Sequence, residues 1–299
     1  MSVVVFGEAM IELSDVQAHS ARIGVAGDTF NTAVYLARSG LDVAYATALG
    51  DDPFSERVRD ALADEGIAKD LALTAPGRTV GLYAITLDDK GERSFTYWRG
   101  QSAARAFFTA PGGEAALDAM SRASLLYFSG ITLSLYTPEE RARLLDAVKR
   151  QRSNGGRFAF DMNYRPRGWP DKSEAQEAAS AAYALADIAL PTFEDDQLLF
   201  GFGTPDACLA HYAALGVSEL ALKCGPDGAL LSGSGWSRPP EVVSPLDTTG
   251  AGDSFNAAYL AARFRGKTPD DAAQAGHKLA AEVLRHYGAI LPRSGAAQS

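Results

Sequence analysis

The chain has 299 residues, 46% of them hydrophobic and 22% charged, with a formal net charge of −9 and an isoelectric point near 5.0. A chain of this size and composition can bury one full-sized core, and an acidic surface without a block of Lys or Arg excludes nucleic acid as a partner, because it repels phosphates. The four histidines and two cysteines show no metal-ligand spacing, which argues against a zinc site built by the protein. We therefore expect one globular domain, 1–299, in which a local basic cluster receives any anionic substrate.

No segment has the pattern of a secretion signal or a membrane span. The apolar run at 3–6 is too short for either, and no later run approaches the length of a span. Cys208 and Cys224 are isolated thiols, which are typical of proteins in a reducing compartment. The sequence predicts a cytoplasmic protein with no membrane partner.

Short β-branched or aromatic runs alternate with segments of helical periodicity. The predicted buried strands are 3–6, 43–48, 125–128, 157–161, 188–191 and 219–223. The predicted helices are 29–38, 53–65, 138–151, 173–185, 205–215 and 270–285, with another after the glycine-rich turn at 250–252. This alternation predicts an α/β fold with a mostly parallel sheet flanked by helices, in which ligands lie beyond the carboxyl ends of the strands.

One region breaks the alternation. Two strand-like runs, 81–87 and 93–99, are joined by the turn-rich link 88–92, so they predict a β-hairpin, which we interpret as a lid. Tyr97 and Arg99 project to one face of the second strand and Trp98 to the other. A guanidinium and a phenol on one face suit a carboxylate, although the pattern is equally typical of an edge strand that Arg99 merely solubilises.

Two further arginines follow the predicted strand 157–161. Arg165 and Arg167 lie where this architecture places ligands, so Arg165 could meet an anionic substrate or a transferring phosphoryl group. The alternative is a turn whose arginines make surface ion pairs of little energetic value.

A glycine-rich turn, 247–253, opens the helix that follows it. The positive end of such a helix attracts anions, and the small residues Gly250, Ala251 and Gly252 let a phosphate approach the backbone. A carboxylate at Asp253 would repel that phosphate unless it accepts a proton from an attacking hydroxyl. The alternative is a capped helix without a ligand.

The segment 247–253, Asp-Thr-Thr-Gly-Ala-Gly-Asp, resembles a signature of the ribokinase-like (PfkB) sugar kinases, and the segment 24–33 resembles their other signature. One departure is Ala26, where many members have glycine. The resemblance implies a single ribokinase-like catalytic domain with a small β lid formed by excursions at about 11–23 and 80–100. It also implies that Asp253 is the catalytic base and that Gly250, Ala251 and Gly252 form the anion hole.

Three shorter segments, 27–31, 97–99 and 161–167, together with 7–13, are similar to 2-keto-3-deoxygluconate kinases. That group implies ATP-dependent phosphorylation of the terminal hydroxyl of 2-keto-3-deoxygluconate, giving 2-keto-3-deoxy-6-phosphogluconate. Arginines suit such a substrate, because an aldonic acid carries a carboxylate that a neutral hexose lacks. Glu12 stands where many relatives place a sugar-binding Asp, and the implied substrate-binding residues are Gly27, Asp28, Asn31, Tyr97, Arg99, Arg165 and Asp253.

The resemblance implies ATP and Mg²⁺ as cofactors. The implied nucleotide-binding residues are Asn163, Arg165, Lys223, Gly225, Asp227, Gly228, Gly250 and Gly252, with His277 and Lys278 on a helix that borders the adenine. Relatives organise magnesium through an Asn-x-x-Glu pattern, whose places Thr192 and Asp195 occupy here. Carboxylates at 194–196 could still order a hydrated Mg²⁺, or could simply complement a helix dipole, so no direct metal ligand is named.

Other functions stay open. A fructokinase or another sugar kinase of the family is the nearest alternative, and a non-catalytic sugar-acid sensor is one from a different class. A dinucleotide-dependent oxidoreductase would need Gly-x-Gly-x-x-Gly after the first strand, where Gly7-Glu8-Ala9 stands instead. The exposed face of the lid hairpin at Trp98 also suggests a homo-oligomer that forms through the lid.

Overall fold

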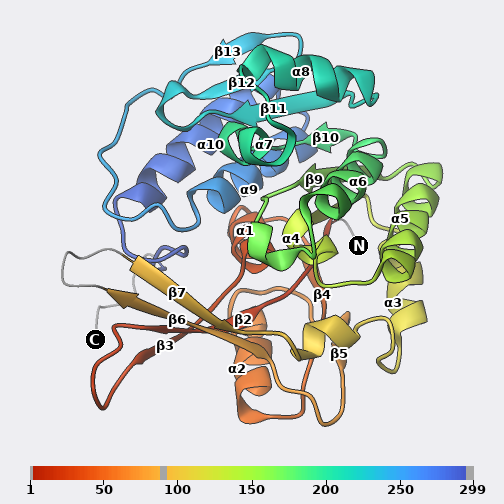
Figure 1. Ribbon diagram of the computed structural model, residues 1–299, viewed down its shortest axis with the longest axis vertical. Coiled ribbons are helices and arrows are strands. Elements are labelled where there is room, and N and C mark those ends of the chain that lie inside the picture. Colours follow the sequence, from red (N-terminus) through yellow and green to blue (C-terminus); the bar gives the residue numbers. More distant parts are fainter. Residues whose placement is uncertain (1–2, 88–92, 294–299) are drawn as a thin grey trace.

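The computed structural model describes residues 3–87 and 93–293. Its main sheet has nine strands in the order β13-β12-β11-β10-β9-β8-β1-β4-β5 (Figure 1). Every neighbouring pair from β11 to β5 is parallel, and only β12 and β13 are antiparallel to their neighbours. The predicted parallel α/β architecture is therefore confirmed. The strands are β1 (Val3–Phe6), β4 (Val43–Leu49), β5 (Ala72–Thr74), β8 (Leu125–Ser129), β9 (Arg157–Asp161), β10 (Ile188–Ala189), β11 (Glu219–Lys223), β12 (Ala229–Leu231) and β13 (Gly235–Ser237).

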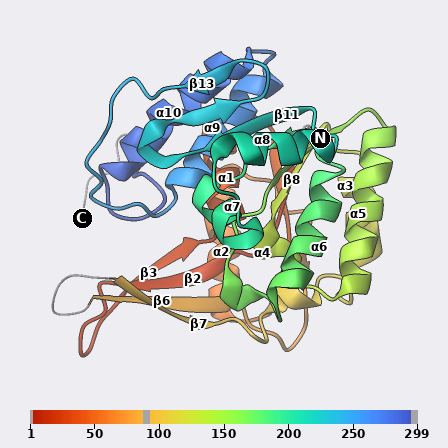
Figure 2. The ribbon, with the colours of Figure 1, turned by 45° about the horizontal axis from the view of Figure 1, so that its top comes forward.

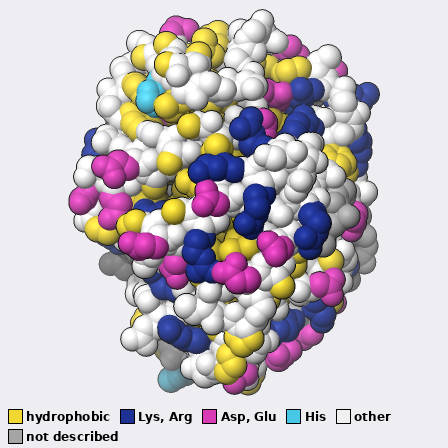
Figure 3. Space-filling view, turned by 90° about the vertical axis from the view of Figure 1, so that its right-hand side faces the viewer, with side chains coloured by type: hydrophobic (Ala, Val, Ile, Leu, Met, Phe, Trp, Pro, Cys, Tyr) yellow, Lys and Arg dark blue, Asp and Glu magenta, His cyan; other side chains and the backbone are white. Residues whose placement is uncertain are grey.

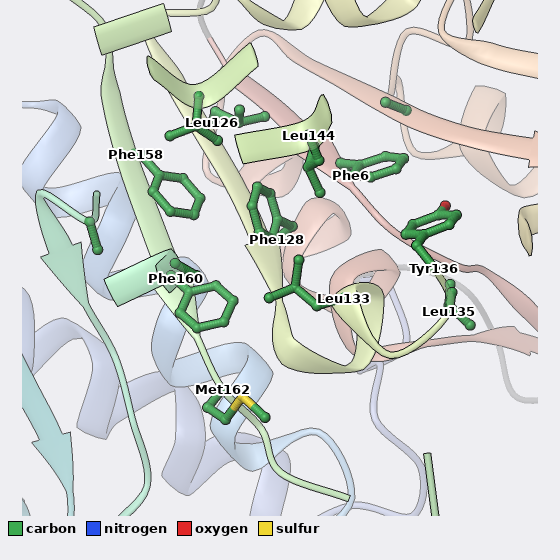
Figure 4. Packing of buried hydrophobic residues seen from close by; sticks show 14 of the residues in the cluster. Phe6, Leu126, Phe128, Leu133, Leu135, Tyr136, Leu144, Phe158, Phe160 and Met162 are labelled. Atoms are coloured by element: carbon green, nitrogen blue, oxygen red, sulfur yellow. The ribbon is translucent and has the colours of Figure 1, made fainter. Parts of the chain in front are cut away.

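Helices cover both faces of this sheet, because alternate residues of each buried strand point to opposite sides. Val3 and Val5 pack with the helices α1 (Asp28–Arg38), α2 (Pro53–Asp64), α9 (Ala251–Phe264) and α10 (Pro269–Leu284). Val4 and Phe6 pack on the other side with α3 (Gly113–Met120), α4 (Gly130–Leu133), α5 (Pro138–Ser153), α6 (Lys172–Tyr183), α7 (Phe193–Phe200) and α8 (Pro205–Ala214). Figure 4 shows aromatic side chains of β8 and β9 meeting α4 and α5 in this second layer.

Several helices start at a signal that is legible in the sequence. An Asp or Thr whose side-chain oxygen accepts a hydrogen bond from the first turn is followed directly by proline at α2, α5, α8 and α10. Proline suits this position, because the first helical N–H has no intrahelical acceptor. At α5, Thr137 and Glu140 complete a reciprocal capping box.

A second sheet of four strands forms the lid, in the order β3-β2-β6-β7 (Figure 2). The strands β6 (Gly81–Leu87) and β7 (Arg93–Trp98) pair antiparallel from Leu82 with Trp98 to Leu87 with Arg93, which confirms the hairpin. The predicted link 88–92 lies outside the described residues. The other two strands, β2 (Met10–Ser14) and β3 (Arg22–Ala26), come from the excursion after β1.

The prediction for 188–191 is too long, since β10 ends at Ala189. Pro191 has no N–H to donate, and the chain turns into α7 after a single bridge between Thr192 and Lys223. The short elements α3, α4, α7, β3 and β5 were not predicted as such. No helix of the described chain combines the length and apolar character needed to cross a bilayer.

Charges on the outer surface are interspersed rather than segregated. Figure 3 shows Lys and Arg side chains next to Asp and Glu on the face that carries α5. Ion pairs on this helix join Arg143 to Glu114, Arg150 to Asp118 and Lys149 to Asp146. Exposed pairs of this kind contribute little to stability and mark no binding surface.

Candidate active site

A cleft of about 2020 Å³ separates the lid from the carboxyl ends of the main strands. The lid contributes Met10, Tyr83, Tyr97 and Arg99, and the main domain contributes the start of α1, the ends of β9 and β11, and the start of α9. This is the edge of the sheet at which parallel α/β folds bind ligands. Most of the residues singled out in the sequence therefore line one cavity.

Gly250 caps helix α9 in the left-handed conformation, with φ 76°. A β-carbon at Gly250 would lie only 2.6 Å from the β-carbon of Ala289, so the C-terminal segment packs directly behind this turn. The carboxylate of Asp247 holds both together, because it accepts from Thr249 N at 3.0 Å and from Gly288 N at 2.7 Å. The Ala251 N–H donates to Thr248 O at 3.3 Å, and the remaining N–H groups of the first turn form the anion-attracting end of α9.

Asp253 lies half-buried on that first turn and lines the cleft. The Asn31 side chain donates to its Oδ2 at 2.8 Å, so helix α1 orients the carboxylate. Burial is the main cause that raises the pKa of Asp253, the negative charge of Asp28 adds to it, and the Asn31 hydrogen bond opposes it. Such a carboxyl is a stronger proton acceptor than an ordinary aspartate when it is ionised.

The start of α1 approaches the cleft at Gly27. A β-carbon there would overlap the carbonyl oxygen of Glu8, so only glycine fits. The next residue, Asp28, accepts a hydrogen bond from the Asn163 side chain at 3.2 Å. Asn163 has φ 41°, a left-handed conformation that costs a non-glycine residue about 1–2 kcal/mol. The structure thus brings together the predicted residues of α1 and of the segment after β9.

The lid presents Tyr97 to the cleft, while Trp98 faces away with 58% of its surface exposed. The predicted alternation of these side chains is therefore confirmed. Arg99 also lines the cleft, but its guanidinium already pairs with the buried carboxylate of Glu8, a partner that the sequence gave no sign of. Glu12 does not line the cleft, because Tyr83 donates to its carboxylate.

Arg105 lines the cleft beside Arg99 and was missed by sequence reasoning, since nothing in its alanine-rich surroundings marks it. Its Nε donates to Arg99 O at 3.3 Å and its Nη1 to Leu135 O at 2.9 Å. Within residues 3–87 and 93–293, no carboxylate forms an ion pair with Arg105. Two backbone carbonyls therefore hold a charged guanidinium without neutralising it.

Arg165 lines the cleft but pairs with Asp195 through its Nη1, at 3.1 Å and 3.2 Å from the two carboxylate oxygens. Arg167 lines the same wall and is exposed, and the described chain offers it no carboxylate partner. Of the predicted cations, Arg165 is therefore engaged by the protein and Arg167 is open to solvent. The exposure of both makes their ion pairs weak and exchangeable.

Lys223, at the end of β11, is buried and reaches across the sheet edge. Its Nζ lies 2.7 Å from Asp161 Oδ2 and 2.8 Å from Asn256 Oδ1. The Asn256 amide also donates to Asp161 Oδ2 at 2.7 Å, which closes a triangle of three buried side chains. Asp161 and Asn256 were not predicted as site residues, because only the tertiary fold brings them together.

The turn after β11 contributes Gly225 and Gly228 to the cleft, as predicted. Asp227 does not line the cleft, and the prediction for it is wrong in this respect, since its exposed carboxylate lies 3.6 Å from Arg238. His277 lines the cleft with its Nε2 3.1 Å from Ser237 O, and burial lowers the pKa of His277. Lys278 is exposed and lies outside the cleft.

The acidic segment 194–196 divides in the structure. Glu194 and Asp195 line the cleft together with Thr192, whereas Asp196 is fully buried behind it and accepts from the Tyr212 hydroxyl at 2.7 Å. In the part of the chain that the structure describes, no group of three His, Cys, Asp or Glu side chains could hold a metal ion. This donor set fits a hydrated Mg²⁺ carried mainly by phosphates, rather than a cage built by the protein.

Comparison with known proteins gives a consistent result. The model of the pfkB family of carbohydrate kinases matches residues 1–295. A 2-dehydro-3-deoxygluconokinase of Escherichia coli is 40% identical over 301 residues, covering 97% of each chain, and one of Haemophilus influenzae is 34% identical over 296 residues, covering 96% of this chain and 94% of that one. The crystal structure of a Vibrio cholerae fructokinase with bound fructose, ADP and calcium ion has a TM-score of 0.83 at 26% identity, covering 97% of this chain and 94% of that chain.

Proposed function

Because this chain belongs to the pfkB family of carbohydrate kinases, we propose that it transfers the γ-phosphoryl group of ATP to the terminal hydroxyl of 2-keto-3-deoxygluconate. The observation that carries the proposal is Asp253, which stands on the anion-attracting turn of α9 and is oriented by Asn31 at 2.8 Å. A second name for this substrate is 2-dehydro-3-deoxygluconate, the sugar acid in the names of the Escherichia coli and Haemophilus influenzae relatives.

In the proposed reaction Asp253 accepts the proton of the terminal hydroxyl as that oxygen attacks the γ-phosphorus. The new O–P bond forms while the bond from the γ-phosphorus to the bridging oxygen breaks, so ADP and the 6-phosphate leave and the proton remains on Asp253. The first-turn N–H groups at Gly250, Ala251 and Gly252 stabilise the negative charge of the transferring group. Little covalent chemistry is asked of the protein, so positioning and charge stabilisation dominate the rate.

Magnesium, when bound with the nucleotide, would neutralise phosphate charge. Cleft carboxylates of Asp28, Glu194 and Asp195 are suited to hold its water ligands, and Gly225 and Gly228 wall the nucleotide. Asn163 and Arg165 stand between the two ligands and can reach the phosphates. Arg165 would exchange its exposed ion pair with Asp195 for a phosphate oxygen.

The carboxylate of the substrate would lie at the lid end of the cleft, where the basic side chains gather. Arg105 and Arg167 carry positive charge without a carboxylate partner among the described residues, and Tyr97 offers a hydroxyl and a flat wall. Arg99 contributes its remaining N–H groups, since Glu8 balances its charge. In an acidic protein this local cluster is what receives an anion.

A fructokinase is the rival that a specific observation favours, because the Vibrio cholerae fructokinase shares the fold over most of both chains. An ADP-release assay over 2-keto-3-deoxygluconate, its galactonate epimer, fructose and ribose decides between them. We expect the sugar acids to have the higher kcat/KM, with Asp253→Asn lowering kcat at least about 100-fold. Preference for fructose would overturn the substrate assignment, and full activity of Asp253→Asn would overturn the role of the base.

A further inference from the structure

The buried ammonium of Lys223 has no role in the reaction as described so far. The side chain is about 10% exposed, yet Lys223 lines the cleft. A buried cation is stable only when a counter-ion and hydrogen-bond acceptors compensate its lost hydration. The fold supplies both, since Asp161 gives the negative charge and Asn256 gives a second acceptor.

The three partners fix the ammonium tightly. Asn256 cannot turn its amide, because its Oδ1 accepts from Lys223 while its Nδ2 donates to Asp161 and, at 3.2 Å, to the Tyr127 hydroxyl. An ammonium has three N–H donors, of which Asp161 and Asn256 take two. The third has no acceptor in the described part of the chain.

The position of this ammonium relates it to the phosphoryl site. A β-carbon at Gly252 would lie 3.8 Å from Lys223 Nζ, so the cation stands beside the first turn of α9. Asp253 follows Gly252 directly, and Asn256 lies one turn further along the same helix. The helix that presents the base to the substrate hydroxyl therefore also holds the cation.

We propose that Lys223 is a catalytic residue whose ammonium donates to an oxygen of the transferring γ-phosphoryl group, and that Asp161 and Asn256 are its positioning residues. This inference rests on phosphoryl transfer at Asp253 and is independent of which sugar is the acceptor. The ammonium needs no rearrangement to act, because its partners already hold it beside the anion site.

Asp161 links this cation to the strained residue of the cleft wall. Its Oδ1 accepts from the backbone N–H of Asn163 at 2.9 Å, while its Oδ2 faces Lys223. The same carboxylate therefore holds Asn163 in its left-handed conformation and anchors the ammonium. Loss of Lys223 alone would leave Asp161 buried and unpaired, which is strongly destabilising.

The test therefore replaces both charges. The double variant Lys223→Gln with Asp161→Asn keeps hydrogen-bonding side chains and removes the buried ion pair. The matched control is Lys149→Gln with Asp146→Asn, an exposed pair at 2.8 Å on α5. Each protein is assayed for kcat with saturating MgATP, for the affinity of MgADP and for the affinity of a non-hydrolysable ATP analogue that retains a γ-phosphoryl group, with thermal unfolding as the folding check.

We expect the Lys223/Asp161 double variant to lose at least 100-fold in kcat and at least 10-fold in affinity for the ATP analogue, with MgADP affinity changed less than threefold. The control pair should match the wild type in all three. A kcat within tenfold of the wild type, or equal losses of ADP and ATP-analogue affinity, would overturn the proposal. If the wild type phosphorylates another sugar instead, the substrate assignment fails, and the same comparison is made with that sugar.

Discussion

Asp253 illustrates how a single residue acquires its chemistry from its surroundings. Burial first, then the negative charge of Asp28, raise the pKa of this carboxyl. Only the ionised form accepts a proton, so kcat/KM should rise as the pH rises through the raised pKa and fall below it. We expect the acidic limb of the pH–rate profile to lie well above pH 4, the region of an ordinary aspartate.

The variant Asp28→Asn separates this cause from a general effect of pH. Removing the neighbouring charge lowers the pKa of Asp253, so the acidic limb should move to lower pH whatever happens to the maximal rate. A limb that stays in place would contradict the assigned electrostatic coupling. The measurement is kcat/KM for the sugar acid between about pH 4 and pH 9.

Arg105 gives a second prediction at the level of one side chain. Arg105→Met should raise KM for 2-keto-3-deoxygluconate about 10-fold or more, because a charge-assisted hydrogen bond to the carboxylate is lost. Kinetic constants for a neutral sugar should hardly change. Arg78→Met is the control, since Arg78 is exposed outside the cleft and donates only to Gln101 O. Equal losses for acidic and neutral substrates would contradict a role in carboxylate recognition.

At the scale of elements, the start of α9 depends on the C-terminal segment behind it. Gly250→Ala would place a methyl group 2.6 Å from Ala289 Cβ, so the turn or the segment must shift. We expect kcat to fall at least about 10-fold, because a shift of about 1 Å at such a site can cost 100-fold. The measurements are kcat, KM for ATP and the melting temperature.

Gly266, at the other end of α9, provides a matched control. It has the same φ of 76° as Gly250, but nothing lies within 4 Å of the β-carbon that alanine would add. Gly266→Ala should therefore show only the backbone strain, about 1 kcal/mol of stability, with normal activity. Equal activity in the two variants would contradict a positional role for the packed turn.

Local patterns predicted the elements well and the partners of the site residues poorly. The strands β9 and β11 match their predicted bounds, because a buried run with β-branched or aromatic residues ends where polar residues begin. The anion turn of α9 was also legible in seven consecutive residues. The pairs Glu8 with Arg99 and Asp161 with Lys223 were not, since each joins segments that only the folded chain brings together.

At the scale of the whole molecule, the lid leaves an unpaired edge at β7. Trp98 is 58% exposed on the face turned from the cleft, and an exposed strand edge with a large apolar side chain favours pairing with a second copy. We predict a homodimer that forms through the lid. Light scattering should show a monomer for Trp98→Glu and a dimer for the control Leu198→Glu, which alters an exposed side chain on α7. A monomeric wild type would contradict the prediction.

The link between α1 and the last described residues has a consequence during synthesis. The Tyr35 hydroxyl donates to Ala289 O at 2.8 Å and accepts from Leu291 N at 3.0 Å, while Asn31, one turn earlier, holds Asp253. A nascent chain on the ribosome must therefore release nearly its whole length before the base acquires its support. Contacts of such long sequence separation form late in folding. Translation thus ends before the protein can consume ATP, which protects the cell from futile hydrolysis by unfinished chains.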